Sequence, residues 1–116
     1  MEETRALLAF AALSQETRLR ILRMLVAAAP EGLAAGAIAE KAGVSASNVS
    51  FHLKELERAG LTRSRRDARS IIHAVELEAL TGLIRFLMED CCAGHPEICM
   101  PLIGTAGRCA TPERTP

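Results

Sequence analysis

Aromatic residues are scarce in this chain. Its 116 residues include no Trp, no Tyr and only three Phe. Surfaces that bind single-stranded nucleic acid stack bases on aromatic rings, so such a surface is not expected here. A net charge is also lacking, because 14 Lys and Arg balance 14 Asp and Glu. This balance excludes a uniformly basic nucleic-acid coat, although it allows a local basic patch.

Long apolar runs are missing as well. The run near the start, residues 6–13, is far shorter than the roughly 20 residues of a membrane span. The chain begins Met1-Glu2-Glu3, whereas a secretory signal begins with basic residues. We therefore expect a cytoplasmic protein without a membrane partner. No acid/base pair or activated nucleophile is apparent, so we do not expect an enzyme or a catalytic cofactor.

Cysteine is absent before position 91, and all four cysteines follow from there: Cys91, Cys92, Cys99 and Cys109. In a cytoplasmic chain such clustering indicates metal or redox chemistry rather than structural disulfides. Gly and Pro are frequent in the same region. We therefore divide the chain into a folded domain, residues 1–92, and a flexible Cys-containing tail, residues 93–116.

The spacing of apolar residues predicts five helices. They cover residues 2–13, a second segment that Ser14 caps and Pro30 ends, and residues 33–42, 46–59 and 77–92. In the helix at 46–59, capped by Ser45 or Ser47, Val49 begins an apolar stripe. Residues 61–65 and 70–75 are predicted strands joined by a turn at 66–69.

This order predicts a mainly α fold with a minor β part: a winged helix-turn-helix of five helices with a two-stranded β-hairpin wing. The diagnostic pair is 33–42 and 46–59, joined by a short turn that contains Gly. Between positions 51 and 73 there are six basic and three acidic residues, a local charge of +3, which is typical of a duplex binder. The candidate contacts to double-stranded operator DNA are Ser45, Ser47, Asn48, Ser50, His52, Lys54, Arg65 and Arg69.

Residues 44–61 resemble the recognition segment of the ArsR/SmtB family. The pattern Val-Ser-x-His-Leu-x-x-Leu-x-x-Ala-Gly-Leu is matched at every fixed position from Val49 to Leu61. Residues 13–22, Leu-Ser-Gln-Glu-Thr-Arg-Leu-Arg-Ile-Leu, resemble the family's second-helix signature. The resemblance covers roughly residues 5–92. It implies a metal- or metalloid-responsive repressor that dimerises through its first and last helices, here 2–13 and 77–92.

Several sensing sites of that family have no counterpart here. The helix at 33–42 and the preceding helix lack Cys, and residues 77–90 lack His. The remaining set, Cys91, Cys92 and Cys99, resembles that of an arsenite-responsive subgroup with a Cys pair after the last helix. This resemblance implies As(III) as the inducer, with Sb(III) as a further candidate. Soft thiolates suit As(III), which needs only three ligands.

Two alternatives remain open on the same scaffold. One is a Zn or Cd sensor, for which Cys109 or His95 supplies the fourth ligand. In the arsenic site Cys109 is a less favoured ligand, either a spare thiol or a replacement for Cys99. The other alternative is a thiol redox-responsive repressor. Neighbouring helical residues point about 100° apart, so Cys91 and Cys92 reach one atom only if the helix frays there.

Overall fold

The computed structural model describes residues 1–94, and for residues 89–94 the backbone alone. The elements are α1 (Glu3–Leu13), α2 (Glu16–Ala27), β1 (Leu33–Ala34), α3 (Ala35–Ala42), α4 (Ala46–Arg58), β2 (Thr62–Asp67), β3 (Ser70–Val75) and α5 (Leu77–Gly94). The chain forms two compact units, Met1–Leu83 and the part from Ile84 on. Five helices and an antiparallel hairpin confirm the predicted fold class. No described helix is both long and apolar enough to cross a membrane.

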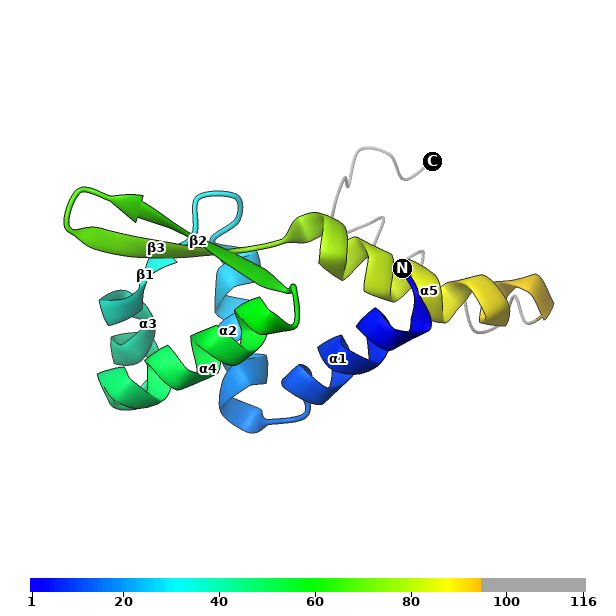
Figure 1. Cartoon of the computed structure of the whole chain (residues 1–116), viewed down its shortest axis with the longest axis horizontal. Coiled ribbons are helices and arrows are strands. Elements are labelled where there is room, and N and C mark those ends of the chain that lie inside the picture. The colour runs from blue at the N-terminus through cyan, green and yellow to red at the C-terminus, as the bar shows by residue number, and fades with distance from the viewer. Residues whose placement is uncertain (95–116) are drawn as a thin grey trace, which may run out of the picture. The chain divides into compact units, whose positions relative to one another are not determined.

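The sheet has three antiparallel strands in the order β1-β3-β2 (Figure 1). A helix was predicted from position 33, but Leu33 and Ala34 form a short strand that pairs with His73 and Ile72 of β3. This pairing joins residues about 40 positions apart, so a local apolar pattern cannot reveal it. The hairpin turn is also shorter than predicted, because Asp67 already pairs with Ser70.

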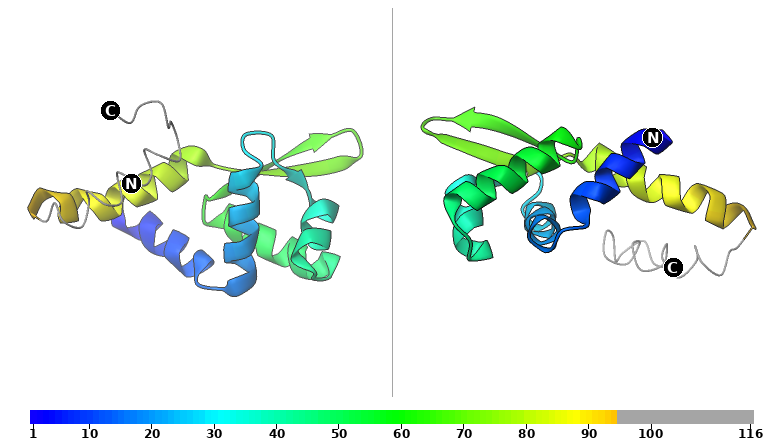
Figure 2. Two further views of the ribbon diagram at one scale, coloured as in Figure 1. Left: turned by 180° about the vertical axis from the view of Figure 1, so that it is seen from behind. Right: turned by 60° about the horizontal axis from the view of Figure 1, so that its bottom comes forward.

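The core lies where α2, α3 and α4 pack against one another and against the sheet, α2 and α3 on β3 and α4 on β2 (Figure 2). The predicted stripe of α4 is confirmed: Val49, Leu53 and Leu56 are each at most 2% exposed. Burying each such side chain stabilises the fold by about 1.5–3 kcal/mol. With one side of α4 fixed in the core, its opposite side faces outward.

The turn between α3 and α4 forms as predicted. Gly43 ends α3 in the left-handed conformation, at φ 70°, which glycine adopts at little cost. Ser45 then caps α4, because its hydroxyl oxygen accepts the backbone N–H of Asn48 at 3.2 Å. The two helices are thereby joined at a defined crossing, and the start of α4 is held in place.

The cap of α2 differs from the prediction. Gln15, not Ser14, accepts the backbone N–H of Arg18, at 2.8 Å. Ser14 instead donates its hydroxyl to the carbonyl of Ala11, at 3.0 Å, at the end of α1. The two helices are only two residues apart, so Ser14 closes the preceding helix and the next residue begins the following one.

Candidate nucleic-acid interface

The outward side of α4 carries most of the predicted DNA contacts. Ser45, Ser47, Asn48, Ser50 and Lys54 are all exposed. They combine short hydroxyl and amide groups near the helix N-terminus with one cation further along. Such groups can approach base edges and phosphates closely. The structure therefore places four of these side chains on α4 and Ser45 at its N-cap, on a helix that is anchored from behind by the core.

His52 is the exception among the predicted contacts on α4, because it is only partly exposed and has a partner inside the protein. Its Nδ1 lies 3.2 Å from a terminal guanidinium nitrogen of Arg18. A guanidinium only donates hydrogen bonds, so Nδ1 accepts and the ring carries its proton on Nε2. Burial, and then the charge of Arg18, lower the pKa of His52 below its ordinary 6.5, against an opposing effect of Glu55.

Arg18 connects this histidine to another helix. Its Nε donates to the carbonyl of Ala12, at 2.6 Å, near the end of α1. One guanidinium thus bridges the last turn of α1 and the middle of α4. The bridge holds the imidazole of His52 in a single neutral form, with Nε2–H free to donate to a ligand.

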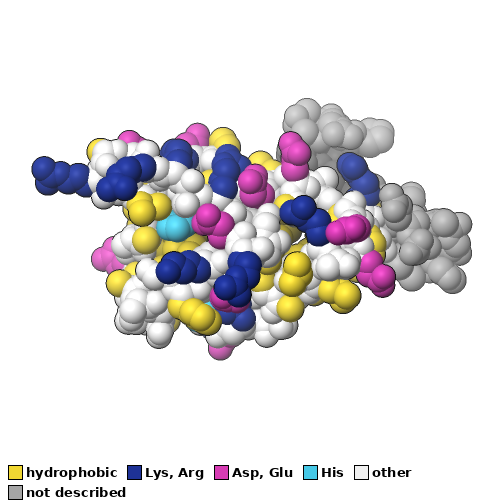
Figure 3. All heavy atoms as spheres, viewed as in Figure 1, with side chains coloured by type: hydrophobic (Ala, Val, Ile, Leu, Met, Phe, Trp, Pro, Cys, Tyr) yellow, Lys and Arg dark blue, Asp and Glu magenta, His cyan; other side chains and the backbone are white. Residues whose placement is uncertain are grey.

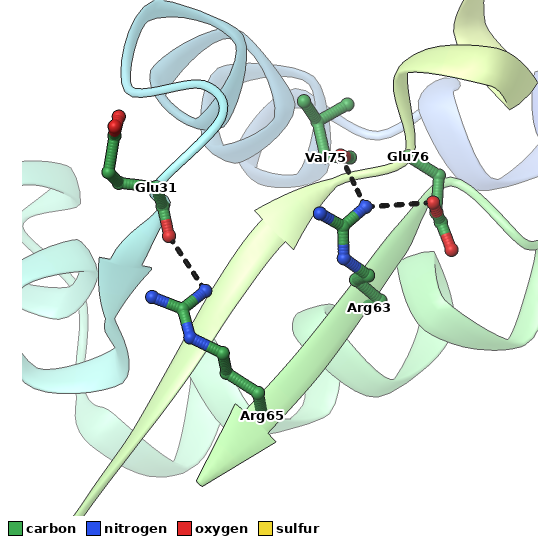
Figure 4. A network of polar contacts seen from close by, with 5 residues as sticks. All are labelled: Glu31, Arg63, Arg65, Val75 and Glu76. Carbon is green, nitrogen blue, oxygen red and sulfur yellow. Dashed lines mark hydrogen bonds and ion pairs between the residues drawn. The ribbon is translucent and has the colours of Figure 1, made fainter. Parts of the chain in front are cut away.

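The arginines of the hairpin differ in their partners (Figure 4). Arg63 pairs with Glu76, at 2.9 Å, and Arg65 donates to the backbone carbonyl of Glu31, at 3.0 Å. Within residues 1–88 no hydrogen bond or ion pair is made by the side chain of Arg66 or of Arg69. The predicted contact Arg65 is thus partly engaged elsewhere, whereas the predicted Arg69 is available.

Strand alternation separates the arginines further. Successive strand residues point to opposite faces, so Arg66 shares a face with Ser64 and not with Arg65. Ser64 lies beside α4, and its cross-strand partner is His73. Arg66 therefore lies on the face of the hairpin that α4 borders. Arg66 was not among the predicted contacts, and the strand register is what places it on this face.

A groove of about 630 Å³ lies between α4 and the hairpin, lined among others by Ser50, Lys54, Arg58 and His73. Figure 3 shows basic side chains at the loop end of the hairpin and over α4, with a histidine side chain in the hollow between them. Burial lowers the pKa of His73, against the opposing charge of Glu57. The groove therefore carries the cations of Lys54 and Arg58 and the carboxylate of Glu57, with His73 among its lining residues.

The structure describes little of the predicted ligand site. Cys91 and Cys92 lie in the last turns of α5, on helical backbone. Cys99, Cys109 and His95 lie outside the described residues. Within the part of the chain whose side chains are described, no three His, Cys, Asp or Glu residues gather as a metal site would require.

A helix pair with a short Gly turn, an exposed polar second helix and an Arg-bearing hairpin define a winged helix-turn-helix domain. Residues 13–65 match the sequence model of a helix-turn-helix domain family. The HTH-type transcriptional regulator YgaV of Escherichia coli is 37% identical over 81 residues, which cover 70% of this chain and 80% of that protein. The regulator YceK of Bacillus subtilis is 43% identical over 61 residues, 53% of this chain and 60% of YceK.

Solved structures agree with these relatives. An ArsR-like transcriptional regulator from Rhodococcus sp. RHA1 matches with a TM-score of 0.69 and 27% identity, covering 84% of this chain and 89% of that one. HlyU from Vibrio cholerae matches with a TM-score of 0.59 and 32% identity, over 75% of this chain and 97% of HlyU. A structure of reduced HlyU is similar too, at 30% identity and a TM-score of 0.58 over 72% of this chain and 88% of HlyU. The chain belongs to the ArsR-like family of winged-helix transcriptional regulators, and its relatives are regulators, not enzymes.

Proposed function

We propose that the chain is a repressor that binds operator DNA as a homodimer and releases it when As(III) binds cysteine thiolates. The observation that carries the DNA-binding part is the outward side of α4. Its exposed hydroxyl and amide groups are held on a helix whose other side is fully buried. The wing supports the same conclusion, because the side chains of Arg66 and Arg69 make no hydrogen bond or ion pair with the described residues.

A homodimer is supported by the inverted pattern of α1. This helix buries three alanines, Ala6, Ala9 and Ala12, and exposes larger apolar side chains. Leu7 is 62% exposed and Leu8 is 53% exposed. A second copy that covers this surface would remove both leucines from water. In a two-fold dimer of winged-helix domains the two recognition helices lie about one DNA turn, roughly 34 Å, apart.

The DNA-binding proposal is tested with matched arginine variants of the wing. The probe is a duplex that the full chain selects from a randomised library. Arg66→Ala and Arg69→Ala should each weaken binding and lower the salt slope by about 0.9 if each contacts one phosphate. Arg63→Ala is the control, because its ion pair with Glu76 is internal to the domain. Equal salt slopes in all three variants would refute the placement of the wing.

The α4 contacts have their own test. Ser50→Ala and Lys54→Ala remove exposed groups, so both proteins should keep the parent's free energy of unfolding. Both should bind the selected duplex more weakly. His52→Ala should weaken binding as well, and it should also cost stability because it leaves Arg18 without its acceptor. Unchanged affinity in all three variants would contradict the assignment of α4.

The inducer part of the proposal is supported by the thiol chemistry of Cys91, Cys92 and Cys99. Three thiolates form a soft ligand set that suits three-coordinate As(III), and Sb(III) by the same reasoning. Cys91 and Cys92 are consecutive residues on the helical backbone of α5, which advances by about 100° per residue. We therefore expect joint ligation to require the last turn of α5 to open.

Serine variants test this ligand set. Replacing Cys91, Cys92 or Cys99 should leave DNA binding intact and abolish release by arsenite. Cys109→Ser should respond nearly as the parent does. A Cys99→Ser protein that still releases DNA at the parent's arsenite concentration would refute the three-thiolate site.

A thiol redox switch is the second candidate, and the similarity to a structure of reduced HlyU favours it. If the switch is redox-controlled, peroxide should release the duplex without arsenite, and a reductant should then restore DNA binding. A Zn or Cd sensor would release the duplex at concentrations of those ions at which arsenite has no effect, which distinguishes it from an arsenite-responsive repressor.

A further inference from the structure

One large apolar side chain lies on the otherwise polar outward side of α4. Phe51 is 57% exposed. Helical residues advance by about 100° each, so Phe51 lies about 200° around the helix from the buried Val49. Ser47, four residues before, and Lys54, three residues after, share its face. Phe51 therefore occupies the middle of the surface proposed to enter the major groove.

The ring of Phe51 is braced from the side. It meets the imidazole of His52 edge to face, with ring centroids 5.4 Å apart and planes at 64°. His52 in turn accepts a hydrogen bond from Arg18 of α2. The phenyl ring is thus supported by a ring that is itself anchored to the domain, which reduces the entropy lost when a ligand immobilises it.

The surroundings of Phe51 favour nucleic acid over a protein partner. Protein-docking surfaces present contiguous apolar patches. Phe51 instead stands among exposed polar and cationic side chains, namely Ser47, Asn48, Ser50, Lys54 and Arg58. The other exposed large apolar side chains of the described residues lie outside α4, among them Leu7 and Leu8 on α1 and Leu19 on α2. Cations beside a single aromatic ring complement a duplex, which offers phosphates outside and apolar groups only at particular bases.

We propose that Phe51 confers sequence specificity by contacting a thymine methyl group in the major groove. This inference rests on the proposed DNA binding through α4. The C5-methyl of thymine is the one apolar group that the standard base pairs present in that groove. Burying it against the phenyl ring removes both from water, and a buried methyl-sized group changes affinity about three- to five-fold.

The experiment removes that methyl and nothing else. A duplex is first selected from a randomised library with the full chain. Each thymidine is then replaced singly by deoxyuridine, which keeps the base pair and lacks only the methyl. In each half-site, one replacement should weaken binding of the parent protein about three- to five-fold, measured by fluorescence anisotropy.

Phe51→Ala should bind the selected duplex more weakly and should be indifferent to that same replacement. Phe51→Leu, which keeps an apolar group, should retain part of the discrimination. Leu19→Ala is the control, because it removes an exposed apolar side chain from α2 and should keep the parent's deoxyuridine pattern. Equal thermal unfolding of parent and Phe51→Ala confirms that the variant is folded.

The outcomes separate this inference from the function on which it rests. If deoxyuridine replacement lowers the DNA affinity of the parent and of Phe51→Ala by the same factor, the role of Phe51 is overturned while the DNA-binding function stands. Unchanged affinity of Phe51→Ala for the selected duplex also overturns it. If the library yields no preferred sequence, the proposed DNA-binding function fails, and this inference fails with it.

Discussion

Replacing Arg18 is predicted to lower the free energy of unfolding more than replacing any other exposed or half-exposed arginine. Arg18→Ala deletes one hydrogen bond to the carbonyl of Ala12 and one to Nδ1 of His52. Hydrogen bonds from charged donors contribute about 1.5 kcal/mol each at the lower end of their range, which suits partly buried groups. The free energy of unfolding should therefore fall by about 2–3 kcal/mol, and the Tm by about 10 °C or more.

Arg20→Ala is the matched control on the same helix. Arg20 makes an exposed ion pair with Glu16 one turn away, and such pairs contribute about 0.3–0.5 kcal/mol. Urea unfolding at pH 7.5 should separate the two variants by at least about 1.5 kcal/mol. Arg18→Lys should fall between them, because a single ammonium group cannot reach both acceptors. Equal losses in Arg18→Ala and Arg20→Ala would refute the bridge between α1 and α4.

Three further predictions concern local features of the fold. Gly32→Ala should destabilise the chain by more than about 1 kcal/mol, because its φ is +91° and an added Cβ would clash with the carbonyl oxygen of His73. Gly36→Ala should stabilise the chain by about 0.5–1 kcal/mol, because an added Cβ would have nothing within 4 Å. Urea unfolding of both variants measures the two changes. Ala68→Gly should stabilise the hairpin by about 1 kcal/mol, because Ala68 holds a φ of 59°, and no gain in Tm would contradict this. The pKa values of His52 and His73 are lowered in the folded chain, so on acidification the unfolded chain binds protons at these histidines first. The free energy of unfolding should therefore be fully retained above about pH 6.5 and should fall below it. A variant with both histidines replaced by Gln should lose less of its free energy of unfolding between about pH 7 and 5.5.

The sequence was most informative where one local pattern decides the structure. The stripe that starts at Val49 and the turn at Gly43 were predicted, and Ser45 was one of two predicted caps, because periodicity, glycine φ and capping chemistry are local properties. The cap of α2 was mispredicted because Ser14 lies between two adjacent helix ends, and its hydroxyl closes α1 instead.

The composition of the interface was less predictable. The exposed polar side of α4 was predicted, but the engagement of Arg65 with Glu31 was not, because it joins residues 34 positions apart. The position of Arg66 depends on strand register, and a register cannot be fixed when the turn length is unknown. The contact between His52 and Arg18 also spans 34 positions. Such contacts arise from packing and leave no periodic signal.

The most direct test of the proposed function follows the anisotropy of a labelled, selected duplex bound to the full chain. At a fixed salt concentration, the protein should bind this duplex far more tightly than a scrambled one of equal length. Arsenite should then release the duplex, while zinc and peroxide at the same concentrations should leave the complex intact. Equal affinity for the two duplexes, or a specific complex that persists at saturating arsenite, would contradict the account.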